Sequence, residues 1–195
     1  MSDHSAEQHD KTEAQPFRWA TPWGLSIAAV TGLVAFAFVS LQITVPIPGM
    51  DVVTDPREVV VILGVAISGP VGAVLVGVLA GVAVPEGNAL ASIVSHVLAG
   101  LAITLAYRYL TRVLRRSTLR FSVLWAVSVA AYFYVFLMPI FILTHNLYHP
   151  EPYDFWSVYT TIARGAFAEA VGTMIITTVV MVILPRRYRR PLWGN

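Results

Sequence analysis

The chain has 195 residues, of which 56% are hydrophobic and only 12% are charged. Soluble domains carry about 25% charged residues, so this composition excludes an ordinary soluble protein. The formal net charge is +2 and cysteine is absent, which excludes disulfides and thiolate metal sites. We therefore expect an all-α polytopic membrane protein.

Five apolar stretches determine how many helices cross the membrane. Those at 23–45, 89–107, 121–144 and 165–185 reach the roughly 20 residues that a span requires. The fifth, 59–84, contains Gly69-Pro70 near its middle. Proline removes a backbone donor and clashes with the preceding turn, so we predict two short helices, about 57–67 and 70–84. This gives six transmembrane helices, with short second and third spans joined by a Gly-Pro turn. One kinked helix, giving five spans, is the alternative.

Arginine clusters predict the orientation. They comprise Arg108, Arg112, Arg115, Arg116 and Arg120, and then Arg186, Arg187, Arg189 and Arg190. Basic residues beside spans mark the cytoplasmic side and favour anionic lipid headgroups, so membrane lipids are expected partners and nucleic acid is not. We expect a bacterial inner (cytoplasmic) membrane protein with both termini cytoplasmic. Its parts are a disordered polar tail (1–16), a single membrane domain (17–186) and a basic tail (187–195).

Polar residues inside or beside the apolar runs are the candidate ligand-binding residues. Asn88, Ser92 and His96 recur every four residues and share one helical face, which should point into the bundle. Arg57 can hold a carboxylate beside a cavity. Each also has a structural explanation, as a hydrogen-bonded histidine or a helix start whose charges face water. The full set is Arg57, Glu86, Asn88, Ser92, His96, Arg164 and Glu169.

Arg164 and Glu169 flank the outer start of the last span. An ionisable group inside an apolar run costs a few kcal/mol unless it is paired or neutral. Their separation of five positions is slightly off the ideal pairing distance, so a partner for Glu169 on another helix, such as Arg57 or His96, is equally open. We expect Arg57, His96, Arg164 and Glu169 to converge on one cavity.

Other patterns favour packing over chemistry. Gly24, Ala28 and Gly32 form a small-residue seam, as do Ala73, Gly77 and Gly81; such seams allow helices to approach closely, although the first also suits a partner membrane protein. The aromatic residues around 148–159 fit an interfacial belt or the lid of a pocket. His145 and His149 have metal-ligand spacing, but the prolines after them make a helix doubtful, so we expect no metal. Without a Walker sequence or nucleophile elbow, we expect neither an enzyme nor a cofactor.

The segment from Asp55 to Tyr109 resembles the membrane sensor domain of LytS-type histidine kinases. The matching features are Asp55-Pro56-Arg57, Gly69-Pro70, Gly72, Gly77 and Gly81, Glu86-Gly87-Asn88, and Ala99-Gly100-Leu101. The same span layout is similar to the substrate-binding S components of energy-coupling-factor transporters.

The two resemblances imply different functions. An S component binds a small-molecule ligand on the outer side and docks on a membrane coupling protein with two ATPases. A LytS-like module would signal through a kinase or regulator. The sequence continues for ten residues after Pro185, so we expect no output domain. We therefore expect the substrate-specificity component of an ATP-driven uptake transporter, with a stand-alone sensory module as the alternative.

Overall fold

The computed structural model describes residues 20–46, 53–54, 56–84, 88–114 and 117–184. The two expected tails, 1–16 and 187–195, lie outside these residues, as does Glu86. The described elements are α1 (Pro22–Ser40), β1 (Val45–Pro46), β2 (Val53–Thr54), α2 (Arg57–Val82), α3 (Ala89–Leu114), α4 (Thr118–Ala131), the π-helix η1 (Tyr132–Leu137), α5 (Met138–Tyr148), α6 (Phe155–Gly165) and α7 (Phe167–Ile183).

Helices long and apolar enough to cross a membrane dominate the described residues. There are four: α1, α2, α3 and the continuous helix Thr118–Tyr148, which joins α4, η1 and α5. A fifth is added if α6 and α7, bent by 51° at their junction, are taken as one span. The expected helical class is therefore confirmed, apart from the short antiparallel pairing of β1 with β2. Helix α1 ends at Ser40, before the end of the apolar stretch at 45, and β1 follows at Val45.

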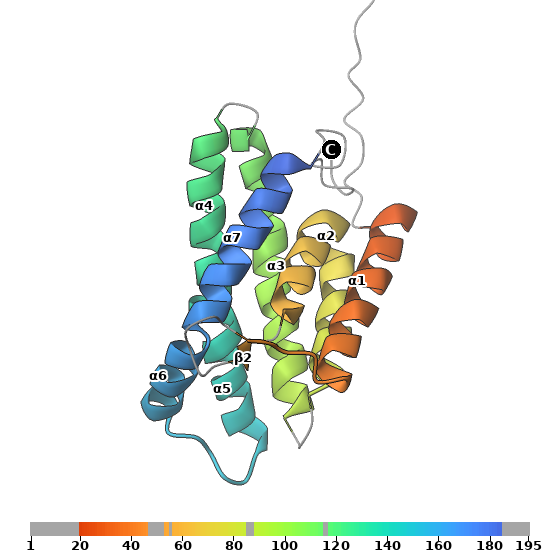
Figure 1. Ribbon diagram of the computed structural model, residues 1–195. Coiled ribbons are helices and arrows are strands. Elements are labelled where there is room, and N and C mark those ends of the chain that lie inside the picture. Colours follow the sequence, from red (N-terminus) through yellow and green to blue (C-terminus); the bar gives the residue numbers. More distant parts are fainter. Residues whose placement is uncertain (1–19, 47–52, 55, 85–87, 115–116, 185–195) are drawn as a thin grey trace, which may run out of the picture.

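The ends of the bundle differ in character. In Figure 1, α1 begins and α7 ends at the end of the bundle where α3 ends and α4 begins. Arg112 lies in the last turn of α3 and Arg120 in the first turn of α4. The α5–α6 connection lies at the opposite end. The described arginines, the start of α1 and the end of α7 thus lie at the same end of the bundle.

Helix α1 begins at a side-chain cap. The Thr21 hydroxyl accepts a hydrogen bond from the Gly24 backbone N–H at 3.0 Å, and Pro22 occupies the first turn, where its missing donor is harmless. The seam Gly24, Ala28 and Gly32 is buried, and α1 packs against α2. This seam serves internal packing, which leaves no open face there for a partner protein.

Gly69 interrupts α2. Its φ of 88° and ψ of −175° are not helical and are essentially restricted to glycine. The two sides of Gly69 run in opposite directions along α3. Before Gly69, Glu58 contacts His96 and Val65 contacts Thr104, so this half runs parallel to α3. After Gly69, residue 77 approaches Val97 and residue 81 approaches Ile93, in antiparallel order. The two halves of α2, 57–68 and 70–82, therefore lie beside one another along α3.

Backbone carbonyls near this break are bonded by side chains. The Ser68 hydroxyl donates to the Gly64 carbonyl at 2.6 Å, and the Thr104 hydroxyl of α3 donates to the Val65 carbonyl at 2.8 Å. Carbonyls in the last turn of a helix lose their usual N–H partners, and Pro70 supplies none. Hydroxyl groups thus satisfy a helix end that is buried among other helices.

Helix α3 is the centre of the bundle and packs against α2, α4, η1 and α5. Its approach to α2 depends on glycine, since a Cβ at Gly81 would lie 2.5 Å from the Ile93 Cα atom. On the other side, the Trp125 indole of α4 donates to the Thr177 hydroxyl of α7 at 3.0 Å. The indole bond thus joins α4 to α7, while the glycine contact holds α2 close to α3.

Candidate functional site

A cavity of about 300 Å³ lies toward the end of the bundle opposite Arg112 and Arg120. It is bounded by the first turns of α2 and α3, by η1 and α5, and by the junction of α6 with α7. Its lining residues are Arg57, Glu58, Val84, Ser92, Ser95, His96, Phe133, Leu137, Met138, Phe141, Ile162, Ala166 and Glu169. We call this space the polar cavity, because charged groups from three helices meet in it.

Glu58 is the centre of the polar cavity's hydrogen bonding. Its side chain is 1% exposed. One carboxylate oxygen, Oε1, accepts from Arg57 Nε at 3.0 Å and contacts His96 Nε2, also at 3.0 Å. The other, Oε2, accepts from the Tyr132 hydroxyl at 2.6 Å. A buried carboxylate is tolerated only when paired and hydrogen-bonded, and here three side chains meet that requirement.

The second ring nitrogen of His96 fixes where its proton lies. Nδ1 is 2.7 Å from the Ser92 carbonyl, and a carbonyl only accepts, so Nδ1 carries a hydrogen. Two states then satisfy the contact with Glu58. Either the carboxylate is ionised and His96 is a cation, or the carboxyl is protonated and donates to neutral Nε2. In both, the Glu58–His96 pair is neutral overall and holds one proton between its members.

Two further ionisable residues, one of each sign, contribute to the net charge of the cavity. Arg57 adds a positive charge at the start of α2, and Glu169, when ionised, adds a negative one at the start of α7. Arg57 has an exposed side-chain fraction of 15%, so it lies at the edge of the cavity rather than beneath it. Ser92 and Ser95 add hydroxyl groups, and Phe133 and Phe141 add aromatic surface. Charged groups of both signs thus stand beside apolar surface in one small space.

The structure brings together four of the residues selected from the sequence: Arg57, Ser92, His96 and Glu169 all line the polar cavity. Asn88 does not line it; instead its side-chain oxygen lies 2.6 Å from His145 Nδ1 and connects the start of α3 to α5. Glu86 is outside the described residues. Whether the four bind a ligand remains a prediction.

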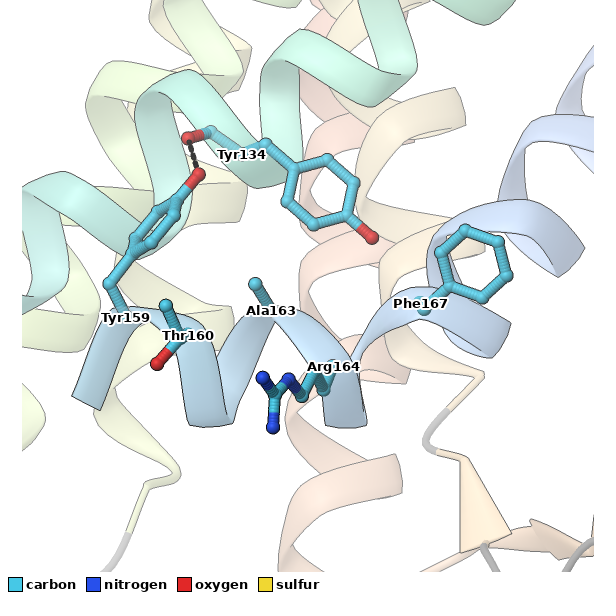
Figure 2. Close-up of a pocket in the computed structure, with 6 residues that line it drawn as sticks. All are labelled: Tyr134, Tyr159, Thr160, Ala163, Arg164 and Phe167. Carbon is cyan, nitrogen blue, oxygen red and sulfur yellow. Dashed lines mark hydrogen bonds between the residues drawn. The ribbon is translucent and has the colours of Figure 1, made fainter. Parts of the chain in front are cut away.

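Arg164 does not lie in the cavity with Arg57, His96 and Glu169, so this part of the prediction is wrong. It lines a separate, exposed pocket of about 590 Å³ together with Tyr134, Tyr159, Thr160, Ala163 and Phe167 (Figure 2). The polar cavity takes Ile162, Ala166 and Glu169 from the same stretch of chain. These sets occupy opposite faces of the α6–α7 segment. We call the pocket that contains Arg164 the outer pocket.

The π-helix shapes both spaces. Met138 N–H bonds the Phe133 carbonyl, five residues back, and Pro139 follows without a donor. With the same five-residue spacing, the Tyr134 carbonyl would accept from the backbone N–H of residue 139. Residue 139 is a proline and has no N–H. The Tyr159 hydroxyl donates to that carbonyl instead, at 2.9 Å. A widened turn therefore directs Tyr132 to Glu58 and fixes α6 against η1.

The aromatic α5–α6 connection forms its own cluster. The ring of Tyr153 stacks on His145 with centroids 3.7 Å apart, and the Asn146 side chain bonds both the N–H and the carbonyl of Tyr153. Trp156 is 71% exposed, as an interfacial aromatic residue would be. None of these residues lines the polar cavity, so a lid role is not seen in this arrangement.

Two residues of the site, Glu58 and Tyr132, were not predicted from the sequence. Glu58 looks like an ordinary acid in the first turn of a helix, where it suits the helix dipole and faces water. Tyr132 lies in a run of aromatic and apolar residues, YFYVFL, that gives no sign of a polar contact. The one available signal for Glu58 was its place at the head of a charge-free run, where burial demands a partner.

No grouping of three or more His, Cys, Asp or Glu side chains suited to a metal ion occurs in the part of the chain that the structure describes. Comparisons with known protein families, with curated proteins and with solved structures found no match to this chain.

Proposed function

We propose that the protein is a membrane-embedded binding protein for a small polar solute, which occupies the polar cavity. The observation that carries this proposal is the buried Glu58, bonded by Arg57, His96 and Tyr132 on the wall of a 300 Å³ cavity. Ionisable groups inside spans are costly and typically mark a pathway or a binding site. Small-molecule sites occupy about 300–1,000 Å³ and combine apolar walls with a few placed polar groups.

The proposal extends to an S-component role in an ATP-driven uptake transporter of the bacterial inner membrane. Its support is the break at Gly69. The segments 57–68 and 70–82 would be about 18–20 Å long at 1.5 Å per residue, shorter than the roughly 30 Å hydrocarbon core. Two short spans there give six in all, place both termini in the cytoplasm, and open the polar cavity toward the outer face. Solute uptake would then require a membrane coupling protein and its ATPases.

The test compares two substitutions on one helical segment. Ala166→Phe fills the polar cavity, whereas Ala163→Phe places the same ring in the outer pocket. Small molecules released by denaturing the detergent-purified protein are identified by mass spectrometry. We expect a solute retained by the unmodified protein and by Ala163→Phe, and lost from Ala166→Phe. Equal retention by both variants would place the solute elsewhere and refute the proposal.

A second comparison uses two arginines. Arg57 lines the polar cavity and Arg164 does not. A hydrogen bond to a charged group contributes about 1.5–3 kcal/mol, so Arg57→Ala should weaken retention about tenfold or more. Arg164→Ala removes the same charge and should leave retention unchanged.

Copurified proteins distinguish the transporter from a sensory module. A coupling protein with ATPases supports the S-component role, and a kinase or regulator supports the sensor. Either result is compatible with solute binding, so this experiment tests the role and the retention experiment tests the site.

A further inference from the structure

The outer pocket is a second candidate binding site. Its 590 Å³ lie between η1 and the α6–α7 junction, on the side of that junction that faces away from the polar cavity (Figure 2). Thr160, Ala163 and Phe167 follow one another at helical spacing on this face. The two spaces are therefore separated by a single helical segment, and a ligand of one need not contact the other.

Tyr134 leaves a polar atom without a partner in this pocket. Its hydroxyl oxygen is buried and forms no hydrogen bond, the one such side-chain atom among the residues that the structure describes. Its ring extends from η1 across the pocket, with the hydroxyl directed toward Phe167 (Figure 2). Buried polar groups are nearly always paired, and leaving one unpaired costs about 1–3 kcal/mol. The position of this hydroxyl calls for an acceptor supplied by a bound molecule.

Arg164 adds a cation at the same place. It is exposed, and within the described residues no carboxylate forms a salt bridge with it. Apolar surface adjoins it: Phe167, which lines the pocket, is 61% exposed. In a membrane-spanning bundle such exposed apolar surface faces lipid, where an arginine is costly unless an anion accompanies it.

We propose that the outer pocket binds an anionic phospholipid. The Arg164 guanidinium pairs with the phosphodiester, which it can contact through two parallel hydrogen bonds. The Tyr134 hydroxyl donates to an ester carbonyl of the glycerol backbone, and an acyl chain follows the apolar surface beginning at Phe167. A guanidinium, a separate hydroxyl donor and a long apolar surface match a lipid better than a soluble phosphate ester, which offers no acyl chain.

Native mass spectrometry of the delipidated, detergent-purified protein tests this assignment. Phosphatidylglycerol is titrated, and binding of the first lipid is compared between variants. Arg164→Ala should weaken it about tenfold or more, since a charge-assisted hydrogen bond is lost. Tyr134→Phe removes only the unpaired hydroxyl and should weaken it about two- to tenfold. Ala163→Phe should block the first lipid, and Ala166→Phe should not.

The control is Arg57→Ala, which removes an arginine that lines the polar cavity and not the outer pocket. It should leave binding of the first lipid within about twofold of the unmodified protein, because Arg57 does not line the outer pocket. An equal loss of lipid binding in Arg57→Ala and Arg164→Ala would show that only the overall positive charge matters and would overturn the site. Unchanged binding in both Arg164→Ala and Tyr134→Phe would also overturn it.

Soluble glycerol 3-phosphate distinguishes the source of the phosphate. It should fail to displace the lipid at millimolar concentration, because it lacks the ester carbonyl and the acyl chain. Displacement would show that a soluble phosphate ester is the ligand and would refute the lipid. The retained solute of the polar cavity is measured separately, so failure of either site leaves the other testable.

Discussion

His96 Nε2 lies 3.0 Å from Glu58 Oε1. The residues are 38 positions apart in the chain, and the first turn of α2 meets the second turn of α3 at this contact. Nδ1 of the same ring lies 2.7 Å from the Ser92 carbonyl, so the imidazole bridges α2 and its own helix. The start of α2 is therefore joined to α3 by a polar contact inside an apolar bundle.

Removing both members of this pair should destabilise the protein by less than the sum of the two single losses. His96→Leu leaves the buried carboxylate with two partners instead of three, and breaking a buried pair typically costs about 3–5 kcal/mol. Glu58→Leu removes the carboxylate that His96 and Arg57 contact. We expect the double variant to lose at least about 1 kcal/mol less than the sum of the single losses, measured by unfolding in detergent. Additive losses would show that the two residues act independently.

Two tyrosines of η1 offer a matched comparison. Tyr132→Phe deletes a 2.6 Å hydrogen bond to Glu58 and should lower the free energy of unfolding by about 1.5–3 kcal/mol. Tyr134→Phe deletes a hydroxyl without a partner in the described residues and, in delipidated protein, should not destabilise it. Equal loss in the two variants would contradict the hydrogen-bond assignment at Glu58.

Gly69 should resist substitution. At its φ of 88° a side chain is strained, so Gly69→Ala should cost about 1–3 kcal/mol in unfolding free energy. Gly165→Ala is the control, because a Cβ there meets nothing within 4 Å and alanine favours a helix. We expect that control to be neutral or slightly stabilising. If Gly69→Ala behaves like its control, the break in α2 is absent in the folded protein.

Single-cysteine labelling tests the orientation, because the native chain has no cysteine. Thr118→Cys lies at the basic end of the bundle and should react only from the cytoplasm. Pro150→Cys lies in the exposed connection between α5 and α6 and should react only from outside. Reaction of Pro150→Cys from the cytoplasm alone would invert the topology.

The helices and part of the candidate site could be predicted from composition and from the positions of polar residues. The apolar runs indicated the helices that are long and apolar enough to cross a membrane. We expected Arg57, His96, Arg164 and Glu169 to converge because each is costly when it faces lipid. Three of them line the polar cavity, whereas Arg164 lines the outer pocket. Gly69, next to Pro70, has non-helical backbone angles inside α2, and the two short spans expected there stay a prediction.

The remaining parts depended on tertiary arrangement. Arg164 and Glu169 lie on either side of the 51° bend between α6 and α7, and they face different spaces. Glu58 is buried because the first half of α2 lies along α3, and no local pattern shows that. Tyr132 reaches Glu58 from a π-helix next to Pro139, where one extra residue in the turn changes which side chains point inward.

An experimental structure of the protein together with the solute that copurifies with it would test the central claim most directly. The account predicts density for that solute between Glu58 and Glu169, within hydrogen-bonding distance of Arg57 or Ser92. Solute density confined to another part of the bundle, with water or lipid tails in the polar cavity, would contradict it.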